Sequence, residues 1–248
     1  MQTQNSATHY LFSGFNLIFS KGVKRFTLIP LIMNLILFIA IWYFALNELQ
    51  LLTTWLDSHL PSWLDWINWL IYLIAIISLF LFSAYLFTAI ALIIAAPFYS
   101  FLAEKIQCKL TKKAVGAPLT FKGFMLIAPK SIVRESKKLI AFLPWVIVIL
   151  VCYFIPVINL FTGILWLILL SWFNVIQYAD YPFDNNEIPF PMMKRQLIKK
   201  RTLSLSFGFI TTIFLMIPIL NIIVIPAAIA GATKMYVEEF HNQSSSSL

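Results

Sequence analysis

Residues 26–46 read FTLIPLIMNLILFIAIWYFAL and contain no charged residue and no histidine. As a helix, these 21 residues would reach about 31 Å, close to the hydrocarbon thickness of about 30 Å in a bilayer. Three further uncharged runs follow, at residues 66–103, 139–179 and 202–233. The chain is 60% hydrophobic and only 11% charged, which is unlike a soluble domain. The sequence therefore predicts an all-α integral membrane protein.

The charges between these runs predict the topology. Residues 47–66 contain Glu48, Asp57 and Asp65 but no basic residue, so all eighteen lysines and arginines lie outside them. Basic residues are retained on the cytoplasmic side during membrane insertion. We therefore expect a periplasmic loop at 47–66 and cytoplasmic N- and C-termini.

The other segments follow from periodicity and length. Apolar residues at positions 11, 12, 15, 18 and 19 form one helical stripe, which is typical of a helix lying on the membrane surface. Residues 66–103 are too long for one perpendicular crossing, so we expect a bend at Pro97 followed by an amphipathic helix. As one membrane domain, 1–248, the chain is divided into an interfacial helix (1–25), a first crossing (26–46), a periplasmic loop (47–66), a second crossing (67–98), a basic cytoplasmic segment (99–138), hairpin 1 (139–179), a cytoplasmic loop (180–201), hairpin 2 (202–233) and a cytoplasmic tail (234–248).

The last two uncharged runs are predicted to be Pro-tipped helical hairpins. Basic residues flank both runs, so each must turn back, and each has a proline near its middle in a repeated pattern: Phe154-Ile-Pro-Val-Ile-Asn159 and Met216-Ile-Pro-Ile-Leu-Asn221. Their arms would be about 22 to 28 Å long, short of a full span. Two interpretations remain: partly penetrating, re-entrant hairpins whose polar tips are covered by protein, or ordinary hairpins in a locally thinned bilayer.

No motif for catalysis or cofactor binding is present. The sequence has no Walker A pattern, no nucleophile constellation and no histidine or cysteine cluster, and Cys108 and Cys152 lack the spacing of a disulfide or metal site. We expect no enzyme activity, no cofactor and no metal. The net charge of +8 is explained by basic residues beside the membrane, so nucleic acid binding is not predicted.

A transport pathway through this protein would be lined by neutral groups. The four runs contain no acidic, basic or histidine side chain, of the kind that ion-coupled transporters usually bury. Asn34, Asn159 and Asn221 are possible pathway-lining residues, and Ser83, Thr88, Asn174 and Gln177 are further candidates.

Gly22, Val23, Lys24 and Arg25 precede the first crossing and form a candidate anion site. Glycine allows a sharp turn, and free N–H groups at a helix N-terminus attract an oxyanion, here beside two cations. The alternative is that these basic residues only determine topology.

Two other basic clusters are best explained by lipid headgroups, with an anion vestibule as the alternative. They are Lys130, Arg134, Lys137 and Lys138, at helical spacing, and Lys194, Arg195, Lys199, Lys200 and Arg201. The segment 177–185, QYADYPFDN, combines interfacial tyrosines with a Pro/Asn turn, so we expect a structural role for it.

Several motifs together resemble the CysZ family of bacterial sulfate permeases, from Gly14 to Gly231. They are Gly22-Val-Lys-Arg-Phe26 with Pro30 and Asn34, Ala95-Ala-Pro-Phe98 with Leu102-Ala-Glu104, Tyr153-Phe-Ile-Pro156, Gln177-Tyr178 with Asp180-Tyr-Pro-Phe-Asp-Asn185, Met216-Ile-Pro218 with Asn221, and Gly231-Ala-Thr233.

This resemblance implies a bacterial inner-membrane protein that admits sulfate for cysteine synthesis and assembles as a homodimer or higher homo-oligomer among membrane lipids. It assigns sulfate binding to the residues that match Gly22, Val23, Lys24 and Arg25. Relatives commonly have arginine where this chain has Lys24, which offers a point charge in place of a planar fork. The rival class is a membrane scaffold or regulator that transports nothing and binds anionic lipid and a cytoplasmic partner.

Overall fold

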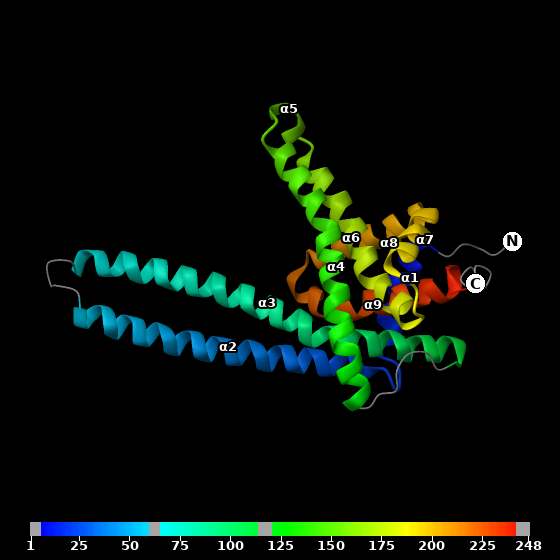
Figure 1. The fold of residues 1–248 in the computed structure, drawn as a ribbon, viewed down its shortest axis with the longest axis horizontal. Coiled ribbons are helices and arrows are strands. Elements are labelled where there is room, and N and C mark those ends of the chain that lie inside the picture. The colour runs from blue at the N-terminus through cyan, green and yellow to red at the C-terminus, as the bar shows by residue number, and fades with distance from the viewer. Residues whose placement is uncertain (1–5, 60–64, 114–120, 242–248) are drawn as a thin grey trace. The chain divides into compact units, whose positions relative to one another are not determined.

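The computed structural model describes residues 6–59, 65–113 and 121–241, and every regular element within these ranges is a helix. The helices are α1 (Ala7–Ile18), α2 (Lys24–His59), α3 (Asp65–Thr111), α4 (Phe121–Tyr153), α5 (Pro156–Asn159), α6 (Thr162–Asn185), α7 (Phe190–Lys199), α8 (Arg201–Leu215) and α9 (Pro218–Glu239) (Figure 1). The prediction of an all-α fold is confirmed.

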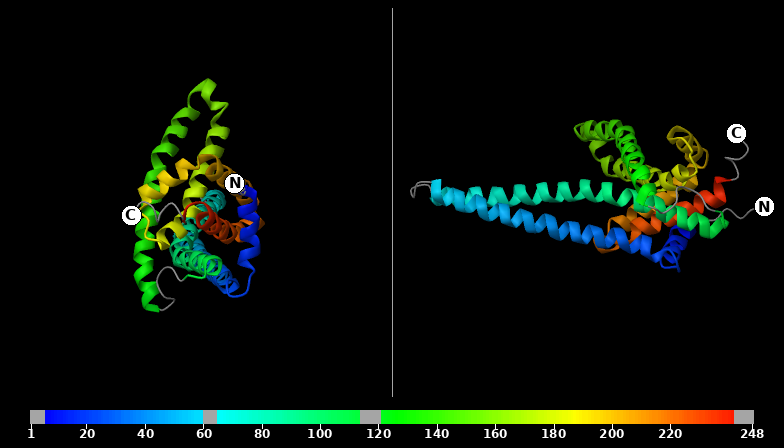
Figure 2. Two further views of the ribbon diagram at one scale, coloured as in Figure 1. Left: turned by 90° about the vertical axis from the view of Figure 1, so that its right-hand side faces the viewer. Right: turned by 60° about the horizontal axis from the view of Figure 1, so that its bottom comes forward.

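The chain divides into two compact units. Residues Ile29–Ala95 form one unit, and Met1–Leu28 together with Ala96–Leu248 form the other. In the first unit, α2 and α3 lie side by side (Figures 1 and 2), and the rings of Trp42 and Phe80 are 5.8 Å apart. Apolar side chains such as Ile36 and Leu81 are more than half exposed, as expected for a surface that faces lipid.

Four helical segments of the described chain are long and apolar enough to cross a membrane. They are Lys24–Trp55, Val133–Tyr153, Thr162–Asn185 and Leu220–Glu239, and the helix Arg201–Leu215 is apolar but shorter. The protein therefore has the helices of a multi-pass membrane protein.

The two predicted hairpin tips are confirmed. α4 ends at Tyr153 and α5 begins at Pro156, whereas α8 ends at Leu215 and α9 begins at Pro218. Each proline occupies the first turn of its helix, where the N–H that it lacks would have no helical partner. The repeated Ile-Pro pattern thus starts a new helix in both hairpins.

The helices that form the arms of the first hairpin are longer than predicted, because they do not stop where charged residues begin. α4 starts at Phe121 and α6 continues to Asn185, so the first hairpin contains candidate spans of 21 and 24 residues. The residues added to these arms include the charged Arg134, Lys138, Asp180 and Asp184, so the length of uncharged helix is unchanged. In the second hairpin α8 has only 15 residues, about 22 Å. Partial penetration stays a prediction.

Three segments predicted as loops or tails are helical over most of their described residues. α2 continues through most of 47–66 to His59, because residues 47–59 contain good helix formers and neither glycine nor proline. In 180–201, α6 runs through Pro182 to Asn185, the turn follows at Glu187 with φ 59°, and α7 fills the remainder. α9 continues into the predicted tail as far as Glu239. α3 likewise runs through Pro97 to Thr111, which confirms the helical continuation there.

Glycines permit the closest helix contacts of the larger unit. A Cβ on Gly14 of α1 would lie 2.0 Å from the carbonyl oxygen of Ala227, and one on Gly231 of α9 would lie 2.6 Å from that of Tyr10. Gly208 of α8 approaches Ser171 of α6 in the same way, with 1.8 Å from a Cβ to the carbonyl oxygen. These backbones touch only because no side chain intervenes, as is common where membrane helices associate.

Candidate functional site

The turn between α1 and α2 contains the predicted anion-binding residues. α1 ends at Ile18, and Ser20 closes the turn because its carbonyl oxygen accepts the amides of Val23 at 3.1 Å and Lys24 at 3.4 Å. Gly22 has φ +85°, a left-handed conformation that strains residues with a side chain. No atom lies within 4 Å of a Cβ built on Gly22, so conformation and not space requires glycine here.

The turn leaves backbone donors available. The amides of Lys21, Gly22 and Arg25 donate no hydrogen bond to the backbone in the part of the chain that the structure describes. These amides lie at the start of the 36-residue α2, whose dipole favours a negative charge at that end. Free amides at a helix N-terminus are the groups that bind oxyanions in proteins.

Buried neighbours fix the turn and leave its cations at the surface. Val23 and Phe26 are 2% and 5% exposed, so they anchor the turn to the larger unit. Lys24 and Arg25 are exposed, and the Arg25 guanidinium lies 4.9 Å from the centroid of the Phe26 ring. Lys21, Lys24 and Arg25 make no ion pair with a described residue. The turn can therefore offer amides and unpaired cations to one small anion.

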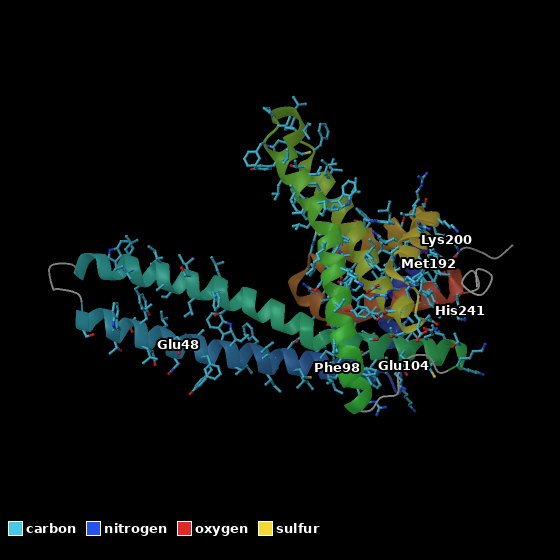
Figure 3. All side chains as sticks on the ribbon, in the orientation of Figure 1. Glu48, Phe98, Glu104, Met192, Lys200 and His241 are labelled. Carbon is cyan, nitrogen blue, oxygen red and sulfur yellow. The ribbon has the colours of Figure 1, made fainter. Side chains whose placement is uncertain are left out.

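Polar contacts between α1 and α9 hold this region in place. The Tyr10 hydroxyl donates to Glu239 Oε1 at 2.9 Å, and Lys200, labelled in Figure 3, pairs with the other oxygen of the same carboxylate. Burial, and then the bond to Glu239, raises the pKa of Tyr10. Lys234 of α9 lies 2.9 Å from His9 Nε2 and donates to Ser13 Oγ at 3.0 Å. α1 is thus packed on the C-terminal helix, which restricts where the turn after α1 can lie.

The three asparagines predicted to line a pathway have different surroundings. Asn34 belongs to the Ile29–Ala95 unit, and its Oδ1 is buried with no hydrogen-bond partner among the described residues. Asn159 is exposed at the first hairpin tip, where its carbonyl oxygen accepts from Thr162 Oγ1 at 2.7 Å. Asn221 is half-buried in the first turn of α9. Asn159 and Asn221 belong to the tips of two different hairpins, and their role as pathway residues stays a prediction.

Two further polar candidates bind other helices. Asn174 donates to Thr212 Oγ1 at 2.9 Å, which links α6 to α8, and Gln177 donates to Glu135 Oε2 at 3.0 Å, which links α6 to α4. Ser83 is buried, and the side chain of Thr88 lies outside the described residues.

A buried ion-pair cluster joins α4 to α6, and sequence reasoning missed it. Arg134 donates from Nε to Asp180 Oδ1 at 2.8 Å, from Nη1 to Asp184, and from Nη2 to the carbonyl oxygen of Ile188 at 3.2 Å. Lys138 lies 3.3 Å from Asp180 Oδ2, and its side chain is 1% exposed. A lipid headgroup cannot reach Lys138 or replace the partners of Arg134. The lipid interpretation is therefore wrong for these two residues.

Glu135 extends the cluster. Its Oε1 lies 2.6 Å from Lys138 Nζ and accepts from the Tyr181 hydroxyl at 3.3 Å, and its Oε2 accepts from Gln177. The expected structural role of the 177–185 segment is borne out by these contacts. The sequence did carry a signal: Asp180 and Asp184 have the same four-residue spacing as Arg134 and Lys138, so two helical faces of opposite charge match.

Glu104 of α3 is a buried carboxylate outside that cluster (Figure 3). It is 8% exposed, and its nearest cation is the neighbouring Lys105 at 3.7 Å. Burial raises the pKa of Glu104, and the charge of Lys105 opposes that shift only in part. The side chain is thus a protonatable group within the larger unit.

Comparison with known proteins gives a consistent result over the whole chain. The family described as Sulfate transporter CysZ/Etoposide-induced protein 2.4 matches residues 10–226. The Sulfate transporter CysZ of Pectobacterium atrosepticum is 38% identical over 243 residues, which cover 96% of this chain and 87% of that protein. Those of Salmonella enteritidis and Salmonella typhi are each 38% identical over 234 residues, 94% of this chain and 92% of theirs. The matched region includes the α1–α2 turn and both hairpin tips.

Proposed function

The chain belongs to the family of sulfate transporter CysZ and etoposide-induced protein 2.4, and from that premise we propose that it carries sulfate across the bacterial inner membrane for assimilation into cysteine. It is a membrane protein of a transporter family and not an enzyme. The observation that carries the proposal is 38% identity to sulfate transporters along 96% of the chain. Because the match covers nearly the whole chain, no segment is long enough to form a separate domain with a different function.

Sulfate recognition is assigned to Gly22, Val23, Lys24 and Arg25. A tetrahedral dianion would accept from the free amides of Gly22 and Arg25 and from the Arg25 guanidinium, and it would be attracted by the Lys24 ammonium. The left-handed Gly22 and the unpaired amides support this assignment. Charge-assisted hydrogen bonds of this kind are shorter and stronger than neutral ones. Lys24 contributes charge but not a bidentate fork.

We place this turn and both chain termini in the cytoplasm, because the basic residues gather there and residues 47–66 have none. The pathway beyond the turn would be neutral, with Asn34, Asn159 and Asn221 as lining residues. Exposed Asn159 at the tip of a bare hairpin requires cover from another polar group or a second copy inside a membrane. We therefore include a homodimer or higher homo-oligomer in the proposal.

Inward movement of sulfate against the membrane potential needs a driving force. A divalent anion entering against 100 mV costs about 4.6 kcal/mol, twice the roughly 2.3 kcal/mol per charge. Cytoplasmic consumption of sulfate or a proton that moves with it would offset this cost. A neutral pathway supplies no part of this free energy. The driving force must therefore come from a process other than contact between sulfate and the lining residues.

The decisive experiment is uptake of radiolabelled sulfate into liposomes that contain only the purified protein. Uptake above that of empty liposomes supports transport, and its loss in Arg25→Ala with unchanged folding supports the anion site. No uptake by folded, inserted protein would overturn the proposal and favour the scaffold that binds lipid and a cytoplasmic partner. Labelling of a single cysteine placed at Lys21 from each side of the membrane tests the orientation.

A further inference from the structure

A groove lies between α4 and the corner where α6 leads into α7. It has a volume of about 860 Å³ and a mostly apolar wall. Val133, Ile140 and Ala141 of α4 form one side, and Phe190 and Pro191 of α7 form the other, with Lys137 also in the lining. We call it the α4–α7 groove.

The α4–α7 groove lies at the ends of two candidate membrane spans. The uncharged run of α4 begins at Leu139, beside the lining residues Ile140 and Ala141, and that of α6 ends at Ala179, five residues before the lining residue Asp184. Ile140 and Ala141 lie about one helical turn further along α4 than Lys137. The groove therefore leads from the polar boundary of the membrane toward its apolar interior, which is the path that one lipid molecule follows.

The charge available to a ligand in the α4–α7 groove is positive. Lys137 is exposed and makes no ion pair with a described residue, whereas Arg134 in the same lining is held by Asp180 and Asp184. Lys194 of α7 extends its ammonium to 5.2 Å from the centroid of Phe190, and it too makes no ion pair in the described chain. The lining thus contains the paired Arg134 and Asp184 and one cation without an ion pair to a described residue, Lys137, while Lys194 lies beside it, one helical turn after the lining residue Phe190.

We propose that the α4–α7 groove binds one anionic phospholipid, with its phosphate held by Lys137 and Lys194 and an acyl chain lying along Val133, Ile140 and Ala141. A free oxyanion would use the cations but has no use for the apolar wall. An apolar segment of a second copy would use the wall but leave both cations without a partner. Only an amphiphile with a negative head matches both halves.

The test uses full-length protein in a neutral detergent and native mass spectrometry with two lipids of identical acyl chains, phosphatidylglycerol and phosphatidylethanolamine. The wild type should bind the first phosphatidylglycerol more tightly than phosphatidylethanolamine. Lys137→Ala should weaken that first binding about five-fold, the factor that corresponds to about 1 kcal/mol for one surface lysine. Lys109→Ala, which removes an exposed lysine of α3 outside the groove, is the matched control and should leave it unchanged.

Two variants change the apolar wall of the α4–α7 groove without removing a cation. Ala141→Trp fills the groove and should lower phosphatidylglycerol binding at constant charge. Val133→Glu, at a half-exposed position that tolerates a polar side chain, should lower it by repelling the phosphate. The thermal unfolding midpoint of each variant, measured without lipid, separates loss of the groove from loss of the fold.

Three results would overturn the proposal. In the first, Lys109→Ala weakens binding as much as Lys137→Ala, so that only surface charge matters. In the second, inorganic phosphate at millimolar concentration displaces phosphatidylglycerol, so that the groove takes a free anion. In the third, Ala141→Trp and Val133→Glu change the dimer fraction and not the number of bound lipids, so that the groove is an interface between copies.

Discussion

The α1–α2 turn and the α4–α6 ion-pair cluster both gather basic residues beside apolar helices, but they use them in opposite ways. In the turn, Lys24 and Arg25 are exposed and make no ion pair with a described residue. In the cluster, Arg134 and Lys138 are enclosed by Asp180, Asp184 and Glu135. The carboxylates across the helix interface, and not the spacing of the basic residues, decide whether a cation is free for a ligand. By the same criterion Lys137, which makes no ion pair with a described residue, is available to a ligand, whereas Arg134 and Lys138 on the same helix are not.

The largest effect should come from removing a cation of the cluster. Arg134→Met would leave the buried carboxylate of Asp180 with only Lys138 as a partner, and we expect a loss of about 3 to 5 kcal/mol in the free energy of unfolding. Lys137→Met, three residues further along the same helix, should change it by no more than about 0.5 kcal/mol. Thermal or denaturant unfolding in detergent measures both. Equal stability of the two variants would show that the cluster is not structural.

Removal of a cation from the turn should affect ligand binding and leave the fold intact. Arg25→Ala removes a charged donor from the proposed site, worth about 1.5 to 3 kcal/mol, so sulfate affinity should fall about 10- to 150-fold. Calorimetric or radiolabel binding measures it, with Arg195→Ala, an exposed arginine of α7, as the control. An unchanged sulfate affinity in Arg25→Ala would leave the turn as a topology determinant only.

The conformation of the turn can be tested without changing any charge. Gly22→Ala meets no neighbouring atom, but its φ of +85° costs a residue with a side chain about 1 to 2 kcal/mol. We expect sulfate affinity to fall about 5- to 30-fold as the turn relaxes and its amides are redirected. Gly163→Ala is the matched control, because it also meets no neighbouring atom and its backbone is helical. If both variants bind sulfate alike, the left-handed glycine has no part in recognition.

A smaller change should sharpen the role of Lys24. Lys24→Arg replaces a point charge by a planar fork that can grip two oxygens of one anion. We expect sulfate affinity to rise a few-fold, measured in the same binding assay, with no change in the unfolding midpoint. A fall in affinity would mean that the ammonium contacts sulfate at a position that a guanidinium cannot occupy.

Glu104 is an intermediate case, because its carboxylate is buried and its charge is only partly compensated by Lys105. Its contribution to the stability of the fold should therefore depend on pH. Because burial raises the pKa of Glu104 in the folded protein, protonation favours the folded state. The stability gained in this way is complete below the unfolded pKa of about 4.3 and is lost as the pH rises through the folded pKa. Glu104→Gln stays neutral, so its unfolding midpoint should decline less than that of the wild type over this range. Parallel pH profiles would rule out a contribution from Glu104.

The sequence predicts those features that depend on neighbouring residues. The hairpin tips at Pro156 and Pro218 follow from the repeated Ile-Pro pattern in the middle of two runs flanked by basic residues, since proline alone does not end α3 at Pro97 or α6 at Pro182. The turn at Gly22 follows from the permissive backbone of glycine. Both are local properties, so no knowledge of the fold is needed to locate them. The amides and cations of the proposed anion site also belong to this short segment, Gly22 to Arg25.

Helix ends and charge pairing are less accessible from sequence. The uncharged runs mark where lipid can surround a helix, but a helix in water continues until its backbone is interrupted, as α2 does to His59 and α6 does to Asn185. The partners of Arg134 lie 46 and 50 residues away, so they depend on the register of α4 against α6. The matching four-residue spacing of the two charge pairs was the single local sign of that register.

The close approach of Gly14 to α9 has a consequence for biosynthesis. The first helix to leave the ribosome packs against the last one, so the α1–α2 turn cannot take its final position until the chain is nearly complete. At about 5 to 20 residues per second, roughly 10 to 40 s of translation separate the two glycines. During that interval the face of α1 that contacts α9 stays uncovered, and a nascent chain that is released before α9 emerges would have every residue of the turn without the helix that holds α1 in place.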